Sequence, residues 1–183
     1  YTEDKMFSFF FPSNIFNLLE KLIKFINSIF FIFLTIGLTF ALVISPPDYL
    51  QGESVRIMYV HVPSSWIGLA CYLAIAIMSV LNFVFKIKIF TLINKCIAPI
   101  GLLFTCLSVI TGSIWGKPTW GTLWVWDARL TSMLVLLFFY IFYILSLKLI
   151  ASKNMSLRVS TFIAIIGSLN IPIIKYSVDW WNT

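Results

Sequence analysis

Apolar residues in this sequence are gathered into five long runs separated by short polar segments. A helix needs about 20 mostly apolar residues to cross a bilayer, because lipid offers no hydrogen-bond partner to exposed backbone groups. The first four runs are free of charged residues, although His61 and Pro63 interrupt the start of the second. The fifth lies between Arg158 and Lys175 and is short, so it spans only if these side chains reach the interfaces. The predicted spans are Phe25–Ser45, Ile57–Phe85, Cys96–Trp115, Leu130–Leu147 and Val159–Ile174.

The composition supports a membrane protein and excludes a soluble domain. Of the 183 residues, 60% are hydrophobic and only 11% are charged, and the mean hydropathy is +0.97. Soluble domains carry about 25% charged residues. The predicted fold class is therefore all-α, a polytopic membrane helix bundle with five transmembrane helices. The three cysteines lie far apart in apolar runs, and their spacing fits neither a disulfide framework nor a cysteine metal site.

The distribution of Lys and Arg predicts how the helices are oriented. With a cytoplasmic N-terminus, nine of the 13 cations fall on the cytoplasmic side and four on the outer side, as the positive-inside rule requires. The cytoplasmic side then carries the whole net charge of +6. The positive charge is thus a topology signal, which removes the case for nucleic-acid binding. The predicted domains are a cytoplasmic or interfacial segment over 1–24 and a membrane domain over 25–183.

All seven tryptophans fall on the outer side in this topology. An aromatic belt is the ordinary explanation, but a belt usually marks both interfaces. If Trp120 and Trp124 lie on a short interfacial helix, their i, i+4 spacing places both rings on one face. The pattern then predicts a flat apolar platform close to Asp127 and Arg129. The segment 115–132, called the tryptophan segment below, contains Trp115, Trp120, Trp124 and Trp126.

The only histidine, His61, lies at the outer start of the second span, at the depth of the tryptophan segment. A lone histidine at a helix end is most often a hydrogen-bonded structural group. Imidazole is also a common axial ligand of haem iron, and a flat apolar macrocycle with two carboxylates suits aromatic faces and nearby cations. Arg56 and Arg129 are candidate partners for those carboxylates, with Lys117 a weaker one. Each cation equally fits the usual role of a charged residue at a membrane interface.

The sequence indicates no catalytic site. Asp127 and Asp179 are the carboxylates nearest the tryptophans, and neither has a histidine or cysteine beside it to form a nucleophile and base pair. Asp127 is expected instead to orient a cation or to cap the fourth span, with Thr131 and Ser132 as competing caps. A glycine-rich phosphate loop is also missing from the sequence. The chain is therefore predicted to bind or transport a ligand and not to act as an enzyme.

Several motifs resemble those of one known family. The tryptophan segment, WGKPTWGTLWVWDARLTS, is similar to the WWD signature of the haem-handling proteins of cytochrome c maturation. Four further motifs occur where the CcmC branch of these proteins, the haem exporter protein C branch, has corresponding stretches. The resemblance covers about Pro46 to Thr183. The four motifs are YVHVP (59–63), APIG (98–101), TGS (111–113) and YSVDWWNT (176–183).

The resemblance implies a multi-pass protein of the bacterial inner membrane, with the mitochondrial inner membrane as the alternative. Such a protein would bind haem b at the periplasmic face and deliver it to the haem chaperone CcmE, together with CcmA, CcmB and CcmD. His61 would be an axial ligand of the iron. In the family a second axial histidine and a sixth helix follow the last motif, so the sequence is expected to be C-terminally truncated and to hold haem weakly alone. The implied site residues are His61, Trp115, Trp120, Trp124, Trp126, Asp127, Arg56 and Arg129.

Two other functions stay open at this point. A haem lyase subunit of the same superfamily would attach haem to apocytochrome, but those proteins are larger and carry more histidines. A small membrane permease subunit would use its tryptophans only as an interfacial belt. Replacing His61 by alanine separates the permease from haem handling, because only haem handling depends on the imidazole.

Overall fold

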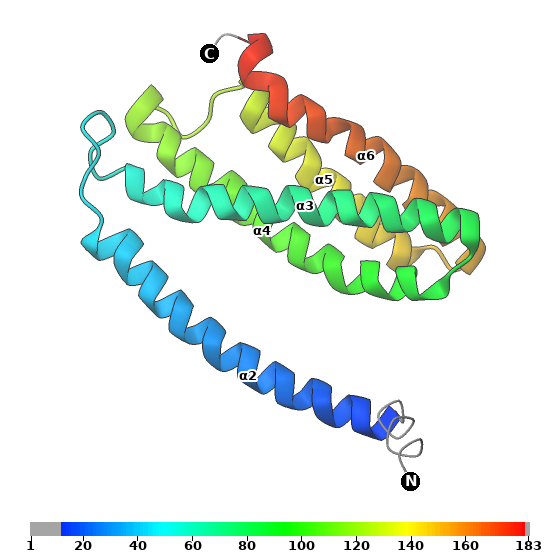
Figure 1. Ribbon diagram of the computed structural model, residues 1–183. Helices are drawn as coiled ribbons and strands as arrows, with labels where there is room; N and C mark the ends of the chain where they lie inside the picture. Colours follow the sequence, from blue (N-terminus) through cyan, green and yellow to red (C-terminus); the bar gives the residue numbers. More distant parts are fainter. Residues whose placement is uncertain (1–11, 182–183) are drawn as a thin grey trace. The chain divides into compact units, whose positions relative to one another are not determined.

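The computed structural model describes residues 12–181, which form helices joined by short loops (Figure 1). This range contains no β-strand, although Asp48 and Gly52 form an isolated bridge within a loop. Five helices are long and apolar enough to cross a membrane, which confirms the predicted all-α class and the five spans. The elements are α2 (Pro12–Thr39), the π-helical turn η1 (Phe40–Ile44), α3 (Val55–Phe85), α4 (Lys88–Trp120), α5 (Ala128–Leu149) and α6 (Lys153–Trp181).

The chain divides into two compact units, Tyr1–Pro46 and Pro47–Thr183. In the first unit, α2 runs unbroken through the position where the 1–24 segment was expected to give way to the first span. Hydroxyl groups in α2 donate to carbonyls one turn earlier, as Thr35 does to Phe31 at 2.8 Å. They therefore add no unpaired polar group in an apolar environment. The part of the 1–24 segment that precedes residue 12 lies outside the described residues.

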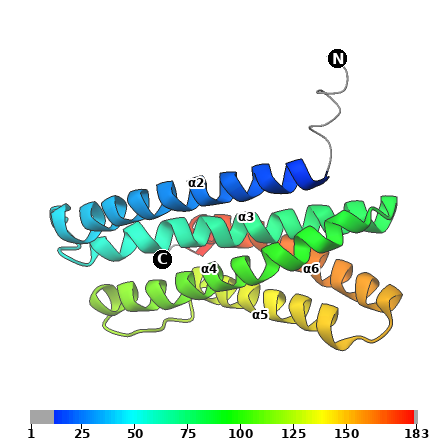
Figure 2. The ribbon, with the colours of Figure 1, turned by 90° about the horizontal axis from the view of Figure 1, so that it is seen from below.

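The second unit is a four-helix bundle in which α3 packs against α4 and α6, and α5 also packs against α4 and α6. The two ribbon views agree on this side-by-side arrangement (Figures 1 and 2). Two residues, Lys86 and Ile87, join α3 to α4, and residues 150–152 join α5 to α6. Such short connections make successive helices antiparallel neighbours. The starts of α3 and α5 and the ends of α4 and α6 therefore lie at one end of the bundle, called the tryptophan end below.

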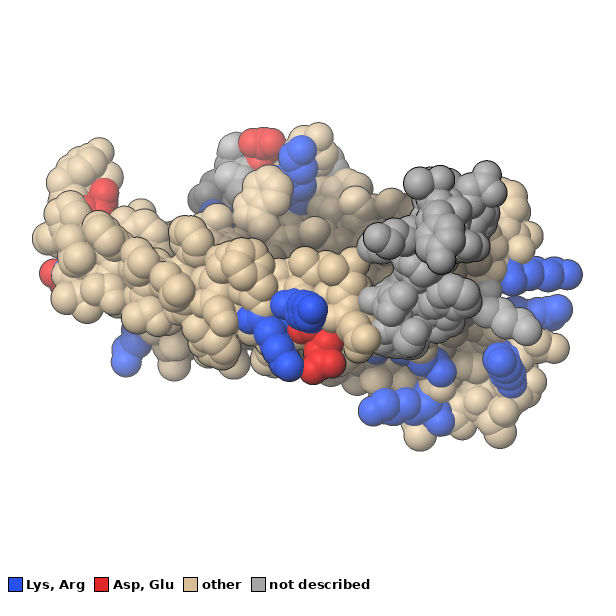
Figure 3. Space-filling model, turned by 60° about the horizontal axis from the view of Figure 1, so that its bottom comes forward, with Lys and Arg blue, Asp and Glu red and all other residues tan. Residues whose placement is uncertain are grey.

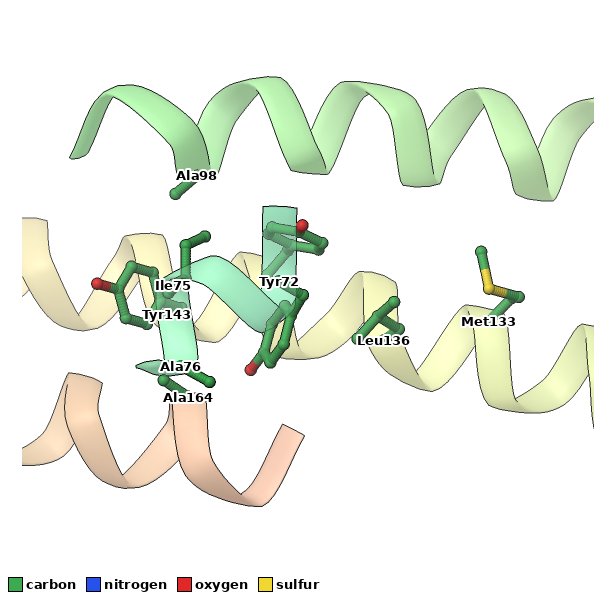
Figure 4. Close-up of a cluster of buried hydrophobic side chains, with 9 residues drawn as sticks. Tyr72, Ile75, Ala76, Ala98, Met133, Leu136, Tyr143 and Ala164 are labelled. Atoms are coloured by element: carbon green, nitrogen blue, oxygen red, sulfur yellow. The ribbon is translucent and has the colours of Figure 1, made fainter. Parts of the chain in front are cut away.

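Aromatic and small residues build the centre of this bundle around Tyr72 (Figure 4). The rings of Tyr72 on α3 and Tyr140 on α5 meet edge to face with their centroids 4.8 Å apart. The Tyr72 hydroxyl donates to a carbonyl of α6 at 3.0 Å, and the Tyr140 hydroxyl donates to a carbonyl of α3 at 2.6 Å. A Cβ at Gly101 or Gly167 would overlap one of these rings. Small residues and interhelical hydrogen bonds drive close packing where the surrounding lipid is as apolar as the core.

All four bundle helices extend further at the tryptophan end than the predicted spans. Helix α3 begins at Val55 and continues through His61 and Pro63, whereas α4 passes Trp115 and ends at Trp120. The prediction that the third helix ends at Trp115 was therefore wrong. Helix α4 stops where Gly121 adopts a left-handed backbone with φ of 75°, a conformation that glycine adopts without steric cost. Apolar runs mark only the part of a helix that lipid surrounds, so they miss its polar last turn.

Candidate functional site at the tryptophan end

His61 lies in the second turn of α3, where its half-buried side chain contacts α4. Its Nδ1 atom is 3.0 Å from the backbone carbonyl oxygen of Ser108 and 3.0 Å from Oγ1 of Thr111. A carbonyl oxygen only accepts hydrogen bonds, so Nδ1 carries the proton and donates it. In the neutral ring the lone pair is then on Nε2, the arrangement that an imidazole needs to bind a metal through Nε2.

Hydroxyl groups fix the helices on either side of the imidazole. Ser65 donates to the carbonyl of His61 at 2.9 Å, and its Oγ lies 2.6 Å from Oγ of Ser108. The Thr111 hydroxyl donates to the carbonyl of Leu107 at 2.6 Å, which leaves its oxygen free to accept from His61. These contacts join α3 to α4 at the level of the ring. The ring plane is therefore set by two helices and not by the His61 rotamer alone.

Gly112 brings the imidazole close to both α4 and α5. A Cβ at this position would lie 3.0 Å from Cε1 of His61 and 3.5 Å from a methyl group of Leu130. A methyl group there would fit only if the imidazole moved by a few tenths of an ångström, so glycine favours this close approach. His61, α4 and the first turn of α5 consequently meet at Gly112.

Asp127 connects the start of α5 to a cation. Its side chain is only 4% exposed. Oδ1 accepts from the backbone N–H of Leu130 at 2.8 Å and so caps α5, and Oδ2 accepts from Nε of Arg129 at 3.2 Å. The guanidinium carbon of Arg129 lies 5.9 Å from the centre of the Trp120 ring, within the range of a cation–π contact. Both roles expected for Asp127, capping a helix and orienting a cation, are confirmed.

The tryptophans form two edge-to-face pairs and not the expected i, i+4 stack. Trp115 and Trp120 have ring centroids 5.7 Å apart, and Trp124 and Trp126 have theirs 5.5 Å apart. The predicted short helix holding Trp120 and Trp124 together was wrong, because Trp120 is the last residue of α4 and residues 121–127 are not helical. The left-handed Gly121 separates the two positions by ending the helix between them.

Two further contacts hold the first tryptophan pair in place. A Cβ at Gly116 would lie 2.7 Å from Cε3 of Trp120, so the absence of a side chain at Gly116 admits the indole. Nε1 of Trp115 donates to Oε1 of Gln51 at 3.1 Å, which links α4 to the loop before α3. The i, i+4 spacing of Gly116 and Trp120 was the available sequence signal for the first contact. Gln51 carried no such signal, because its partner is far away in the sequence.

Arg56 and the remaining outer-side tryptophans lie on separate elements of the same end. Arg56 is in the first turn of α3, and its Nε is 2.9 Å from Oε2 of Glu53. Trp66 and Trp126 are 73% and 76% exposed, so each presents a broad apolar face. The side chains of Trp180 and Trp181 lie outside the described part of the structure, as does any histidine beyond Thr183.

The side chains at this end do not form a site for a bare metal ion, but their chemistry is compatible with a flat apolar ligand that carries its own metal. Among the described residues, no group of three His, Cys, Asp or Glu side chains could hold a metal ion. The end provides one imidazole with an available Nε2, exposed indoles and a guanidinium fixed by a buried carboxylate. These are the groups that an iron macrocycle with acidic substituents would use.

Comparison with known proteins gives consistent matches. A family model described as CcmC, heme exporter protein C, matches residues 5–183. Heme exporter protein C of Escherichia coli (strain K12) is 44% identical over 150 residues, which is 82% of this chain and 61% of that protein. Heme exporter protein C of Bradyrhizobium diazoefficiens is 37% identical over 172 residues, covering 94% of this chain and 65% of that protein.

A ccmC-like mitochondrial protein of Marchantia polymorpha is 50% identical over 140 residues, or 76% of this chain and 59% of that protein. The chain thus spans 59–65% of the length of these relatives. The names of these relatives describe heme export and cytochrome c biosynthesis, which are transport and assembly functions and not an enzymatic reaction. On the family match, the relatives and the five membrane-length helices, the chain belongs to the CcmC family, the heme exporter C proteins of cytochrome c maturation.

Proposed function

We propose that this protein binds haem at the periplasmic face of the membrane, with Nε2 of His61 as an axial ligand of the iron. The hydrogen bond from Nδ1 of His61 to the carbonyl of Ser108 carries this proposal. It selects the tautomer whose Nε2 is available, and it fixes the plane in which that atom can meet a metal.

The tryptophan segment supplies the apolar surroundings that a macrocycle requires. Trp126 is mostly exposed although it borders the buried Asp127, so its ring is available to a ligand. Trp115, Trp120 and Trp124 are partly buried in edge-to-face pairs that hold their rings in defined planes. Indoles fixed in this way lose little conformational entropy when a flat ligand binds.

Arg129 and Arg56 are the proposed partners of the haem propionates. In each case the atom close to the neighbouring carboxylate is Nε. A guanidinium has two further nitrogens that can donate to a carboxylate. Asp127 would therefore act as a positioning residue, because it orients Arg129 and caps α5 together.

In the proposed pathway the bound ligand is haem b, and the second axial ligand is a histidine beyond Thr183. The protein would act in the inner membrane with CcmA, CcmB and CcmD and pass haem to the chaperone CcmE. Opposite charge distributions at the two ends of the bundle support the periplasmic placement, since cations are concentrated at the end away from His61. The role is binding and transfer, with no catalytic group required in this chain.

The test is to replace His61 in the full-length protein and measure haem absorbance after purification. His61→Ala is expected to lower bound haem to about a tenth or less, because even outer partners of a metal ligand are worth 10- to 100-fold. Val62→Ala, at the neighbouring exposed position on α3, is the matched control and should retain haem. His61→Gly with added imidazole should recover the low-spin spectrum, which separates a lost ligand from a lost fold. Unchanged haem content in His61→Ala would overturn the proposal.

A further inference from the structure

A hollow lies at the end of the bundle opposite His61. It has a volume of about 730 Å³ and is formed where α3 ends and where α4 and α6 begin. One wall is closed by a hydrogen bond from Nδ2 of Asn82 on α3 to Oγ1 of Thr91 on α4, at 2.9 Å. We call this hollow the basal pocket. Its lining residues are Asn82, Phe83, Lys86, Thr91, Leu92, Lys95, Lys153, Asn154, Leu157, Arg158 and Thr161.

Four cations from three helices line the basal pocket, and no carboxylate does. They are exposed, and none of the four makes an ion pair with any residue that the structure describes. Lys and Arg side chains gather at this end of the bundle (Figure 3). Their mutual repulsion falls when an anion binds among them. The four are Lys86, Lys95, Lys153 and Arg158.

Lys86 has a backbone conformation that residues with a Cβ seldom adopt. It ends α3 with φ of 57° and ψ of 32°, in the left-handed region, and its N–H bonds the carbonyl of Asn82 at 2.8 Å. Glycine is the usual residue at such a helix end because it lacks a Cβ. A lysine here places a fourth positive charge at the pocket despite that conformational cost.

The apolar part of the lining distinguishes between possible anions. Phe83 and Leu92 are 58% and 59% exposed, and both border the pocket beside the cations. A soluble anion would gain nothing from these side chains. A phospholipid would use them, because its acyl chains can lie along the apolar surfaces while its phosphate lies among the cations.

From this geometry we propose that the basal pocket binds the phosphate headgroup of an anionic phospholipid between α3, α4 and α6. Lys95 and Arg158 hold the phosphate, Asn154 and Thr91 add hydrogen bonds, and the acyl chains lie against Phe83 and Leu92. This lipid would tie the three helices together at the end where only short loops connect them. The proposal is independent of haem binding at the tryptophan end.

The competing explanation is that these cations only fix the orientation of the helices. That explanation predicts that every Lys or Arg at this end attracts anionic lipid equally. Lys148 provides the matched comparison, since it is exposed in the last turn of α5 but does not line the pocket. Lys95→Gln and Lys148→Gln remove the same charge from the same end of the bundle.

The experiment is native mass spectrometry of the full-length protein titrated with phosphatidylglycerol and, separately, with phosphatidylcholine. Phosphatidylglycerol is expected to bind more tightly, and Lys95→Gln and Arg158→Gln should each weaken it about fivefold. Lys148→Gln should have less than half that effect. Lys86→Gly should also weaken binding while leaving thermal stability intact, because glycine suits the left-handed position.

Three results would overturn the proposal. Equal weakening by Lys148→Gln and Lys95→Gln would show a general surface effect. Equal binding of phosphatidylcholine would show that the cations do not select the lipid. Full displacement of phosphatidylglycerol by excess inorganic phosphate would identify a soluble anion as the ligand.

Discussion

The two ends of the helix bundle differ in how their charged side chains are paired. At the tryptophan end, three of the four carboxylates have a local partner among the described residues: Asp48 accepts from backbone N–H groups, Glu53 pairs with Arg56, and Asp127 pairs with Arg129. At the other end, within residues 47–181, there are cations and no carboxylate. Most carboxylates at one end are therefore paired locally, whereas the cations at the other end have no carboxylate beside them within this bundle.

The difference distinguishes charges that position a ligand from charges that only attract an anion. A guanidinium held by a buried carboxylate has a defined orientation, which suits a site that must present a few groups accurately to one ligand. Exposed cations without such partners act mainly through their combined field, which falls off within a few Debye lengths. This contrast fits the proposals that the tryptophan end binds a shaped ligand and that the opposite end meets anionic lipid.

Replacing Asp127 gives the sharpest test of this contrast and the largest expected effect on stability. Asp127→Ala removes the cap of α5 and the partner of Arg129 in one step. The free energy of unfolding in mixed micelles should fall by about 1–2 kcal/mol. Lys95→Gln at the opposite end removes an exposed charge with no ion pair among the described residues, so it should change stability by less than about 0.5 kcal/mol.

Asp127→Asn divides the two roles of this residue. Asparagine is as good a helix cap as aspartate, so most of the stability should return. The charge that orients Arg129 would still be missing. Haem absorbance in the full-length protein should therefore be lower than in the unsubstituted protein, for Asp127→Asn as for Asp127→Ala. If Lys95→Gln proved as destabilising as Asp127→Ala, the contrast between the two ends would not hold.

A second variant tests whether the tryptophan end is organised before any ligand binds. Gly116→Ala would place a Cβ 2.7 Å from the Trp120 ring, so the indole must move away from Trp115. We expect a changed near-UV circular dichroism spectrum and a stability loss of about 1 kcal/mol. Gly37→Ala, where a Cβ meets nothing within 4 Å, is the control and should be neutral or slightly stabilising. An unaltered spectrum in Gly116→Ala would argue against a fixed pair.

The smallest expected effect concerns Asp48 in the loop before α3. Backbone N–H groups of Gln51 and Leu50 lower the pKa of this carboxyl below its ordinary value of 3.8. A lowered pKa in the folded state means that the stabilisation is complete above 3.8 and is lost as pH falls through the folded value. The Trp115 indole N–H resonance, which reports on Gln51, should therefore stay constant down to about pH 4 and shift below it. In Asp48→Asn this shift should vanish; its persistence would assign the titration to another group.

The helices were predictable because hydropathy is a property of each local segment, and it decides whether that segment can enter the lipid. Five apolar runs became five long helices, and the acidic residue before the fourth run became a helix cap, as its residue type suggested. His61 was also recognisable from sequence, as the only imidazole beside the tryptophan-rich segment. Each of these predictions depends on neighbouring residues or on composition.

Contacts between distant residues could not be predicted in the same way. The spacing of Trp120 and Trp124 suggested one helical face, but the helix ends at Gly121, between the two residues. Trp120 therefore pairs with Trp115, and Trp124 pairs with Trp126. The acceptor for His61 is the backbone of Ser108, on another helix, and every residue has such a carbonyl. No sequence feature distinguishes the carbonyl of Ser108 from the others.

By itself, the sequence determined a membrane protein with five apolar helices, an uneven charge distribution and a histidine placed among tryptophans. These follow from residue types and their order, through the cost of placing charge or bare backbone in lipid. Only the tertiary structure decided the tautomer of His61, the partner of each tryptophan and the grouping of four cations around one pocket. Those depend on which helices meet, and small residues such as Gly101 and Gly112 set how closely the helix surfaces approach.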